Sequence, residues 1–285
     1  MESVRNLVVV YNAGKPGVAE LAAEFSEHAR RAGREVKLIG TYPIPAGSFE
    51  GFDACCVVGG DGTLMSVATE AAREGTRVFG VNQGKLGFLA MFDVEEARVF
   101  FDDFLAGNFR TSDRSLLECR SAGGSVAWAL NDVVISTNTS RVARLRVVAD
   151  ESKLVNVYSA DGIVVSTPTG STAYNLSAGG ALIHPRAPVI AVTPICPHTL
   201  TNRGLIVGEN TRLSIATEPT SSTVRVVCDG TECFVTEAAG GVPVEISLAP
   251  KRLPLVLRPG YTYFELVRSK LGWHGDPLPE MFKEE

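Results

Sequence analysis

The sequence predicts an α/β domain followed by an all-β domain, and three observations lead to this prediction. The chain has 285 residues, which is long for one ordinary domain and fits two. Its first third alternates apolar, β-branched runs with segments of helical periodicity, a pattern typical of a parallel sheet with covering helices. From about Ser112 to Val267, short runs rich in Val, Ile, Thr and Ser are separated by Gly, Pro, Asn and Asp, as in an antiparallel β domain.

The elements of the first third follow one another over short connections. From Val18 to Ala29, apolar side chains spaced three and four residues apart predict an amphipathic helix, which Gly33 ends. A second helix follows the sequence Gly-Gly-Asp-Gly-Thr and ends at Gly75. Strands are expected at residues 7–11, 54–58 and 78–81.

The composition shift near residues 110–115 predicts the domain boundary. We therefore assign residues 1–112 to the α/β domain and residues 113–267 to the β domain. Residues 268–285 are polar and mixed in character. They are expected to form either a last helix that packs back on the first domain or a tail.

Composition and charge exclude several classes of protein. Hydrophobic residues make up 45% and charged residues 21% of the chain, which fits a globular protein with a sizeable core. There is no uninterrupted apolar stretch of about 18 residues and the first apolar run is short for a secretory signal, so we expect a cytoplasmic protein that does not span a membrane. The net charge of −5, with no long basic run, argues against nucleic-acid binding, and the six cysteines lack the spacing of a zinc site.

The first candidate site is the glycine-rich segment Gly59, Gly60, Asp61, Gly62 and Thr63, between a predicted buried strand and the start of a helix. Unpaired backbone N–H groups and the helix dipole favour a phosphate at such a position. The spacing is neither that of the dinucleotide fingerprint nor that of the P-loop. We therefore expect Gly59, Gly60, Gly62 and Thr63 to bind the phosphates of a nucleotide.

Asp61 is the informative residue of this segment, and two interpretations are open. Asp is favoured as a helix N-cap, which would give it a structural role. However, a carboxylate among phosphate-binding glycines repels the anion beside it, so its presence needs a chemical reason. Accepting a proton from an attacking hydroxyl would be such a reason.

Two further clusters combine polar and small side chains. Residues 166–174 (Ser-Thr-Pro-Thr-Gly-Ser-Thr-Ala-Tyr) follow a predicted strand, and they offer hydroxyls for phosphate or sugar oxygens and Tyr174 as a flat face for a base. Asn131 and Asp132 together suit an adenine edge and ribose hydroxyls. Each cluster is also compatible with an ordinary turn.

Four motifs together resemble those of the NAD kinase family in order and spacing. They are GGDGT at 59–63, GVNQGKLGFLA at 80–90, ALNDVV at 129–134 and DGIVVSTPTGSTAYNLSAGG at 161–180. The first motif is shared with lipid and sugar kinases, whereas the fourth is specific, and the resemblance covers residues 5 to 275. It implies a Rossmann-like α/β domain, a C-terminal β domain, an active site between them, and assembly as a homodimer or homotetramer.

The resemblance also implies the substrates and the roles of individual residues. ATP would phosphorylate the 2′-hydroxyl on the adenosine ribose of NAD, with Mg²⁺ or another divalent metal held largely by the triphosphate and water and no dedicated metal cage in the protein. Asp61 would accept the proton. The NAD-binding residues would be Asp61, Gly62, Asn131, Asp132, Arg144, Asp161, Thr172, Ala173, Tyr174, Asn175, Leu176 and Ser177.

The sequence departs from the family pattern at two positions. Thr231 stands where the family often has Gln after Asp-Gly, and Ser159 stands where some relatives have Arg two residues before Asp161. Two other functions remain alternatives: a lipid or sugar kinase that shares the glycine loop, and a catalytically silent NAD-binding regulator. The long fourth motif disfavours the first alternative, and the presence of Asp61 disfavours the second.

Overall fold

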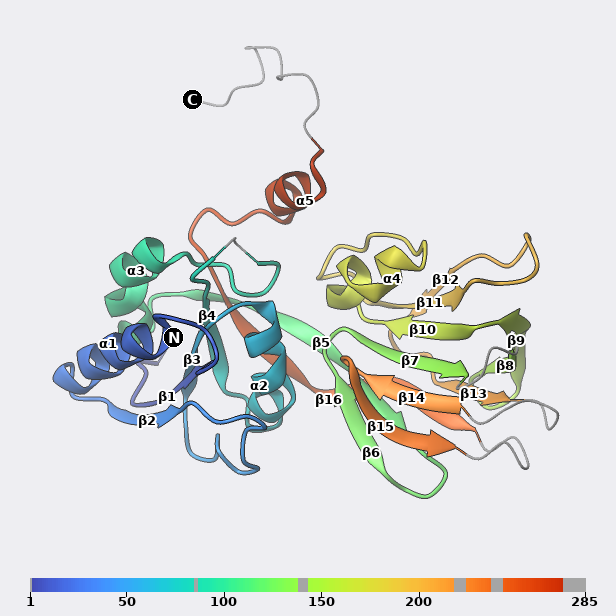
Figure 1. Ribbon diagram of the computed structural model, residues 1–285, viewed down its shortest axis with the longest axis horizontal. Helices are drawn as coiled ribbons and strands as arrows, with labels where there is room; N and C mark the ends of the chain where they lie inside the picture. Colours follow the sequence, from blue (N-terminus) through green and yellow to red (C-terminus); the bar gives the residue numbers. More distant parts are fainter. Residues whose placement is uncertain (1, 85–86, 138–142, 218–223, 237–242, 274–285) are drawn as a thin grey trace, which may run out of the picture.

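The computed structural model describes residues 2–84, 87–137, 143–217, 224–236 and 243–273, and these form two halves joined by long strands (Figure 1). The elements of the first half are β1 (Asn6–Tyr11), α1 (Val18–Arg31), β2 (Glu35–Ile39), β3 (Ala54–Val58), α2 (Asp61–Glu74), β4 (Arg77–Val81) and α3 (Val94–Ala106). Strands β2, β1, β3 and β4 pair in that order, all in parallel.

Helices cover both faces of this parallel sheet. In β4, the ring of Phe79 stacks on that of Phe104 in α3, with centroids 4.7 Å apart. The next residue, Gly80, faces Leu64 of α2. Because successive residues of a strand point to opposite faces, α3 and α2 lie on opposite sides of the sheet. Together with the second half, this arrangement confirms the predicted fold class.

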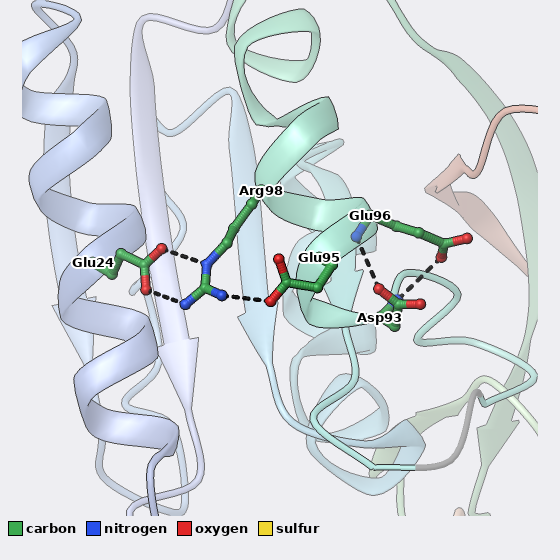
Figure 2. A network of polar contacts seen from close by, with 5 residues as sticks. All are labelled: Glu24, Asp93, Glu95, Glu96 and Arg98. Carbon is green, nitrogen blue, oxygen red and sulfur yellow. Dashed lines mark hydrogen bonds and ion pairs between the residues drawn. The ribbon is translucent and has the colours of Figure 1, made fainter.

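Polar contacts join the two helices on the α3 side, α1 and α3 (Figure 2). The guanidinium of Arg98 donates two hydrogen bonds to Glu24 of α1, both of 2.7 Å, and a third to Glu95 within α3. Asp93 and Glu96 form a capping box at the start of α3. These exposed contacts fix how α3 begins, directly after the loop that follows β4.

The second half contains most of the antiparallel strands. Its elements are β5 (Arg110–Arg120), β6 (Val126–Ala129), β7 (Asp132–Thr137), β8 (Ala143–Ala149), β9 (Lys153–Ala160), β10 (Gly162–Ser166), η1 (Thr169–Thr172), α4 (Tyr174–Ser177), β11 (Val189–Ile195), β12 (Leu205–Gly208), β13 (Leu213–Thr217), β14 (Val224–Cys228), β15 (Thr231–Thr236), β16 (Val244–Leu257) and α5 (Tyr263–Leu271). One core lies between two layers, with Ile135 and Ile163 from one sheet and Leu145 and Ile215 from the other fully or almost fully buried in it.

Two long strands, β5 and β16, run through both halves. They pair with each other from Arg110 opposite Leu257 to Arg120 opposite Glu245. β16 also pairs with β4 in parallel and with β13 in the antiparallel sense, so a single sheet continues from the α/β half into the β half. The expected division between residues 112 and 113 falls inside β5, and the one after residue 267 falls inside α5.

Helix α5, the last described helix, contacts the segment between α4 and β11. The hydroxyl of Tyr263 donates a hydrogen bond of 3.1 Å to the carbonyl of Ile183, and its ring meets the edge of His184. Part of the C-terminal segment is thus a helix, and residues 274–285 lie outside the described residues. None of the described helices is both long and apolar enough to span a membrane.

The close approach of β4 to α2 and to the loop after β4 requires glycine at position 80. A methyl group on Gly80 would lie 2.8 Å from Leu64 Cδ1 and 2.9 Å from the Cα of Ala90. We expect Gly80→Ala to lower the free energy of unfolding by about 1–3 kcal/mol. Urea titration measures this, with Gly208→Ala as the control because Gly208 has open space around it. Equal stability of the two variants would contradict this packing.

Candidate active site

The glycine-rich segment forms the connection from β3 to α2. Helix α2 begins at Asp61, and its N-cap residue, Gly60, has an extended backbone and no capping side chain. The N–H of Thr63 donates to the carbonyl of Gly60 at 3.0 Å. Helix geometry leaves the N–H groups of Asp61 and Gly62 without intrahelical partners, and the helix dipole makes this end electropositive. A side chain at Gly59 would run into that of Thr63, whereas one at Gly62 would meet open space. The segment is therefore close-packed on one side and open on the other.

The carboxylate of Asp61 turns away from its own helix. It accepts three backbone hydrogen bonds from the loop after β4: from Phe88 N at 2.8 Å, Leu89 N at 3.1 Å and Ala90 N at 2.9 Å. A side chain at Gly87 would collide with this carboxylate. The helix N-cap interpretation of Asp61 is therefore wrong, because the carboxylate holds a neighbouring loop. Its place at the edge of the glycine-rich segment is fixed by that loop.

A cavity of about 490 Å³ opens beside Asp61. Besides Gly59, Gly60 and Asp61, it is lined by residues of the loops after β1 and β4 and by Lys270 of α5. The ammonium of Lys15 lies over the glycines, 3.6 Å from where a side chain on Gly60 would begin. Two lysines and a helix N-terminus thus surround one cavity, a combination suited to an anion.

The backbone of Asn131 and Asp132 is held by hydrogen bonds to another acidic residue, Asp229. Its carboxylate accepts hydrogen bonds from the backbone N–H groups of Leu130, Asn131 and Asp132, at 2.6, 2.7 and 3.2 Å. Asp229 and Gly230 both have positive φ angles, 48° and 81°, in the tight turn between β14 and β15. This conformation suits an Asp-Gly hairpin, and it places the carboxylate next to the site.

The two carboxyl groups of this cluster differ in their hydrogen bonding. Burial and the negative charge of Asp229 together raise the pKa of Asp132 to about 7. Burial also raises the pKa of Asp229, but its three backbone N–H partners oppose that shift. Asp229 is thus the better stabilised anion, and Asp132 is the member of the pair that takes up a proton near neutral pH.

The hydroxyl-rich segment packs directly against Asn131. The hydroxyl of Thr167 donates to the carbonyl of Leu130 at 2.6 Å, and the backbone N–H of Thr167 donates to the carbonyl of Asn131 at 2.9 Å. A side chain at Gly170 would collide with the backbone of Asn131. Several of these hydroxyls therefore hold the backbone of the neighbouring loop in place.

Residues 172–177 differ in their accessibility. Tyr174 and Ser177 are exposed, whereas the residues between and before them are partly buried, namely Thr172, Ala173 and Leu176. Asn175 is fully buried: its amide donates to the carbonyls of Ser171 and Ala181 and accepts from Thr193. Its side chain therefore makes hydrogen bonds within the protein that hold this segment in place.

The two halves meet close to Asp61. The side-chain amide of Asn131 contacts the sulfur of Met65 at 3.3 Å. Met65 lies one turn after Asp61 on α2, a rise of about 6 Å along the helix. The structure therefore brings Asp61, the glycine-rich segment and the Asn131–Asp132 pair together.

Asp161 and Arg144 lie at the other end of the β10 region. Asp161 directly precedes β10, whereas Asp132 pairs with Ser166, the last residue of that strand. Five residues of extended chain separate the two positions, or about 17 Å. Arg144 pairs with Ser159 and so lies near the Asp161 end, with its side chain exposed. Within one chain, these two residues do not join the others.

Three residues near the site could not be identified from sequence motifs. Lys15 and Lys270 line the cavity, but neither belongs to a recognisable motif, and Lys270 is far from the others along the chain. Asp229 is part of the Asp-Gly-Thr sequence at 229–231, where only Thr231 departs from the family pattern. An Asp-Gly pair between two β-rich runs predicts a hairpin turn, but it does not predict which backbone that carboxylate binds.

The raised pKa of Asp132 makes stability depend on pH. Since this pKa lies above its ordinary value of 3.8, the carboxyl contributes stability below about pH 4 that is lost as the pH rises through about 7. In Asp132→Asn this loss is absent. We expect the wild type to lose about 2–4 kcal/mol relative to the variant between pH 4 and 8, measured by urea unfolding.

The variant Asp229→Asn provides the matched comparison. It removes the like charge, so the loss should occur at lower pH than in the wild type. Parallel pH profiles for the wild type and Asp132→Asn would contradict the assignment of the raised pKa to Asp132.

Comparison with known proteins identifies the family of the chain. Residues 9–109 match the model of the ATP-NAD kinase N-terminal domain, and residues 130–256 match that of the ATP-NAD kinase C-terminal domain. The chain is 36% identical to the NAD kinase of Symbiobacterium thermophilum over 92% of its own length and 97% of that protein. It is 40% identical to the NAD kinase of Syntrophotalea carbinolica over 80% and 81% of the two chains.

Two solved structures share the fold. Yeast NADH kinase complexed with NADH has a TM-score of 0.85 at 24% identity, covering 98% of this chain and 91% of its own. The NAD kinase from Archaeoglobus fulgidus in complex with ATP has a TM-score of 0.77 at 22% identity, covering 95% and 100%. Both domain models, the relatives over nearly the full length and this shared fold lead to one conclusion: the chain belongs to the NAD kinase family.

Proposed function

We propose that the chain transfers the γ-phosphoryl group of ATP to the 2′-hydroxyl on the adenosine ribose of NAD, with Asp61 as the proton acceptor. The observation that carries this proposal is the placement of Asp61. Its carboxylate is held by three backbone N–H groups beside a cavity lined by two lysines, one helical turn from the contact with Asn131.

The hydrogen bonds of Asp61 support its role. A carboxylate offers about four lone-pair positions. Among the described residues, Leu89 and Ala90 occupy two positions on Oδ1, and Phe88 occupies one on Oδ2. This leaves one position on Oδ2 for a substrate hydroxyl. The carboxylate would take the hydroxyl proton as the oxygen forms its bond to the γ-phosphorus and the bond from that phosphorus to the β–γ bridging oxygen breaks, releasing ADP.

The phosphates of the donor would lie at the start of α2. Backbone N–H groups there, with Lys15 and Lys270, would neutralise the charge of the transferred group, and most of the rate enhancement would come from alignment and charge. No group of three or more potential metal ligands occurs in the described part of the chain. Mg²⁺ would be carried by the triphosphate oxygens and water, where it would supply further charge neutralisation.

The adenosine of NAD would bind to the β half. Asn131 and a protonated Asp132 can donate and accept hydrogen bonds at an adenine edge and the ribose, and the exposed ring of Tyr174 can stack on a base. The buried hydroxyl of Thr169 has no hydrogen-bond partner in the described chain, which supports a ligand or water beside this segment. The lipid and sugar kinase alternative does not account for these groups.

A shared site supports assembly as a homodimer or homotetramer. Asp161 lies about 17 Å from Asp132 along β10, and Arg144, which pairs with Ser159, lies near the Asp161 end. They could contact NAD together with Asn131 if a second copy supplies them.

The six cysteines are free, which fits the reducing cytoplasm.

Asp61→Asn tests the proposed base. We expect kcat to fall by at least about 10²-fold while NAD affinity stays within a few-fold, because a base acts mainly in the transition state. Coupled assay of NADP formation measures kcat, and calorimetry measures NAD binding.

Asp53→Asn is the matched control, because Asp53 also accepts backbone hydrogen bonds, from Arg5 and Asn6, but lies outside the cavity. It should leave kcat near that of the wild type. Near-normal turnover of Asp61→Asn would show that the Asp61 carboxylate has only a structural role.

Subunit mixing tests the shared site. Asp61→Asn should be inactive alone because it lacks the proposed base. Asp161→Ala should be inactive alone because each site lacks the Asp161 that the second copy supplies. In a mixed dimer, one site receives an intact Asp61 from one chain and an intact Asp161 from the other. We expect co-refolded equimolar chains to recover about a quarter of the wild-type activity, because half of the dimers are mixed and one of their two sites is intact.

The control is the two variants assayed together without refolding, which should stay inactive. Failure of the co-refolded mixture to gain activity, while light scattering shows an oligomer, would contradict the shared site.

A further inference from the structure

Arg114 of β5 carries a buried positive charge that has no acidic partner. Only 2% of its surface is exposed. No carboxylate of the described residues acts on its guanidinium, and its Nε has no hydrogen-bond partner among them. A guanidinium stays protonated in proteins, so loss of a proton cannot relieve this charge. Because a buried charge without a counter-ion costs stability, its presence needs a reason.

Strand pairing places the side chain of Arg114 on the face of the sheet that α2 covers. Arg114 pairs with Leu253 of β16. Leu255, two residues later on the same face, pairs with Val78 of β4. Gly80, two residues after Val78, faces α2. Since alternate residues of a strand share a face and paired residues point the same way, Arg114 lies on the α2 side of the sheet.

Two phenol groups at the start of α5 act on this charge. Burial lowers the pKa of the Arg114 guanidinium, and the hydroxyls of Tyr261 and Tyr263 oppose that shift. The hydroxyl of Tyr261 is itself buried. A phenol oxygen accepts hydrogen bonds, so it can stabilise a guanidinium without neutralising it. The charge of Arg114 is thus linked to the segment that leads into α5.

Tyr263 connects this charge with two parts of the site. Its hydroxyl donates a hydrogen bond of 3.1 Å to the carbonyl of Ile183. The backbone N–H of Ile183 donates in turn to the hydroxyl of Ser171, in the hydroxyl-rich segment, at 3.0 Å. Tyr263 is also the first residue of α5, and Lys270 follows two turns later, about 10 Å along the helix. Lys270 and Lys15 line the cavity beside Asp61, called the lysine-lined cavity below.

Helix α5 has little apolar packing of its own. Among its residues, Leu266 and Val267 are buried, whereas Phe264 is 66% exposed. A helix of this length is not stable in water by itself. The polar contacts at its start are therefore important for where α5 lies, and so for where it places Lys270.

We infer that Arg114 is a positioning residue: its buried charge holds Tyr261 and Tyr263, which place α5 so that Lys270 lines the cavity for the donor phosphates. The inference rests on the proposed phosphoryl transfer and adds to it the residue that fixes one of its two lysines. It also accounts for the unpaired charge, because a destabilising group is retained where function gains from it.

Stability and ligand binding together separate this role from a purely structural one. Arg114→Met replaces the charge with an apolar side chain. We expect the midpoint of urea unfolding to be no lower than that of the wild type, because a buried charge is removed. Calorimetry with full-length enzyme and Mg²⁺ should show about ten-fold weaker binding of ATP, because Lys270 is displaced.

Arg34→Met is the matched control. The Nε of Arg34 is also buried without a hydrogen-bond partner in the described chain, but Arg34 lies between α1 and β2 and outside the lysine-lined cavity. This variant should bind ATP within about two-fold of the wild type. Equal weakening of ATP binding in Arg34→Met and Arg114→Met would overturn the inference.

A double-mutant cycle tests whether Arg114 acts through Lys270. Lys270→Ala should weaken ATP binding about ten-fold, as expected for the loss of a charge-assisted contact. In the Lys270→Ala background, Arg114→Met should then change ATP affinity by less than about two-fold. Additive effects of the two substitutions would overturn the inference. Wild-type ATP affinity in either single variant would also overturn it.

Tyr263→Phe decides the question if Arg114→Met does not fold. It removes only the hydroxyl that binds the carbonyl of Ile183. We expect about five-fold weaker binding of ATP, again lost in the Lys270→Ala background. Unchanged ATP affinity would overturn the inference. Because calorimetry does not depend on turnover, the expected binding changes in an enzyme that forms no NADP would support the role of Arg114 and overturn the phosphoryl transfer.

Discussion

The hydrogen bonds between the Asp61 carboxylate and the N–H groups of residues 88–90 determine the geometry of the site. They fold the loop after β4 over the start of α2, and the same loop leads into the capping box of α3. The orientation of α2 then sets the position of Met65, which contacts Asn131 across the two halves. The carboxylate that borders the lysine-lined cavity thus also joins the loops after β3 and β4.

A carboxylate that accepts three consecutive backbone hydrogen bonds also occurs in the β half. The carboxylate of Asp229 accepts hydrogen bonds from the N–H groups of residues 130–132, as that of Asp61 does from residues 88–90. Three consecutive N–H groups on one carboxylate stabilise its charged form and fix the loop that carries them. Burial and the negative charge of Asp229 raise the pKa of Asp132, whereas the three N–H groups oppose the raised pKa of Asp229, so Asp132 is the proton-binding member of the pair. Each half of the site therefore has an acidic residue that shapes a loop.

Local patterns in the sequence were sufficient to predict much of the first half. Helical periodicity predicted α1, which begins at Val18, and Gly75 marks the end of α2. The glycine-rich segment and the Asn131–Asp132 pair could also be singled out as candidates, since each is a short continuous motif, and the structure brings them close together. What could not be predicted depends on contacts between distant residues. The sequence around Lys270 does not indicate that this residue of α5 lines the same cavity as Gly60. The hydroxyls of the fourth motif do not indicate that Thr167 binds a backbone carbonyl while Tyr174 is exposed.

The pairing of β4 with β16 has a consequence for how the chain is made. Leu255 pairs with Val78, a partner 177 residues earlier. During synthesis the parallel sheet therefore completes its β4 edge only after nearly the whole β half has left the ribosome. Until then this edge has unpaired backbone groups, which can pair with other chains. We expect the nascent α/β half to depend on chaperones or on rapid folding of the β half, and fragments that end before β16 to aggregate.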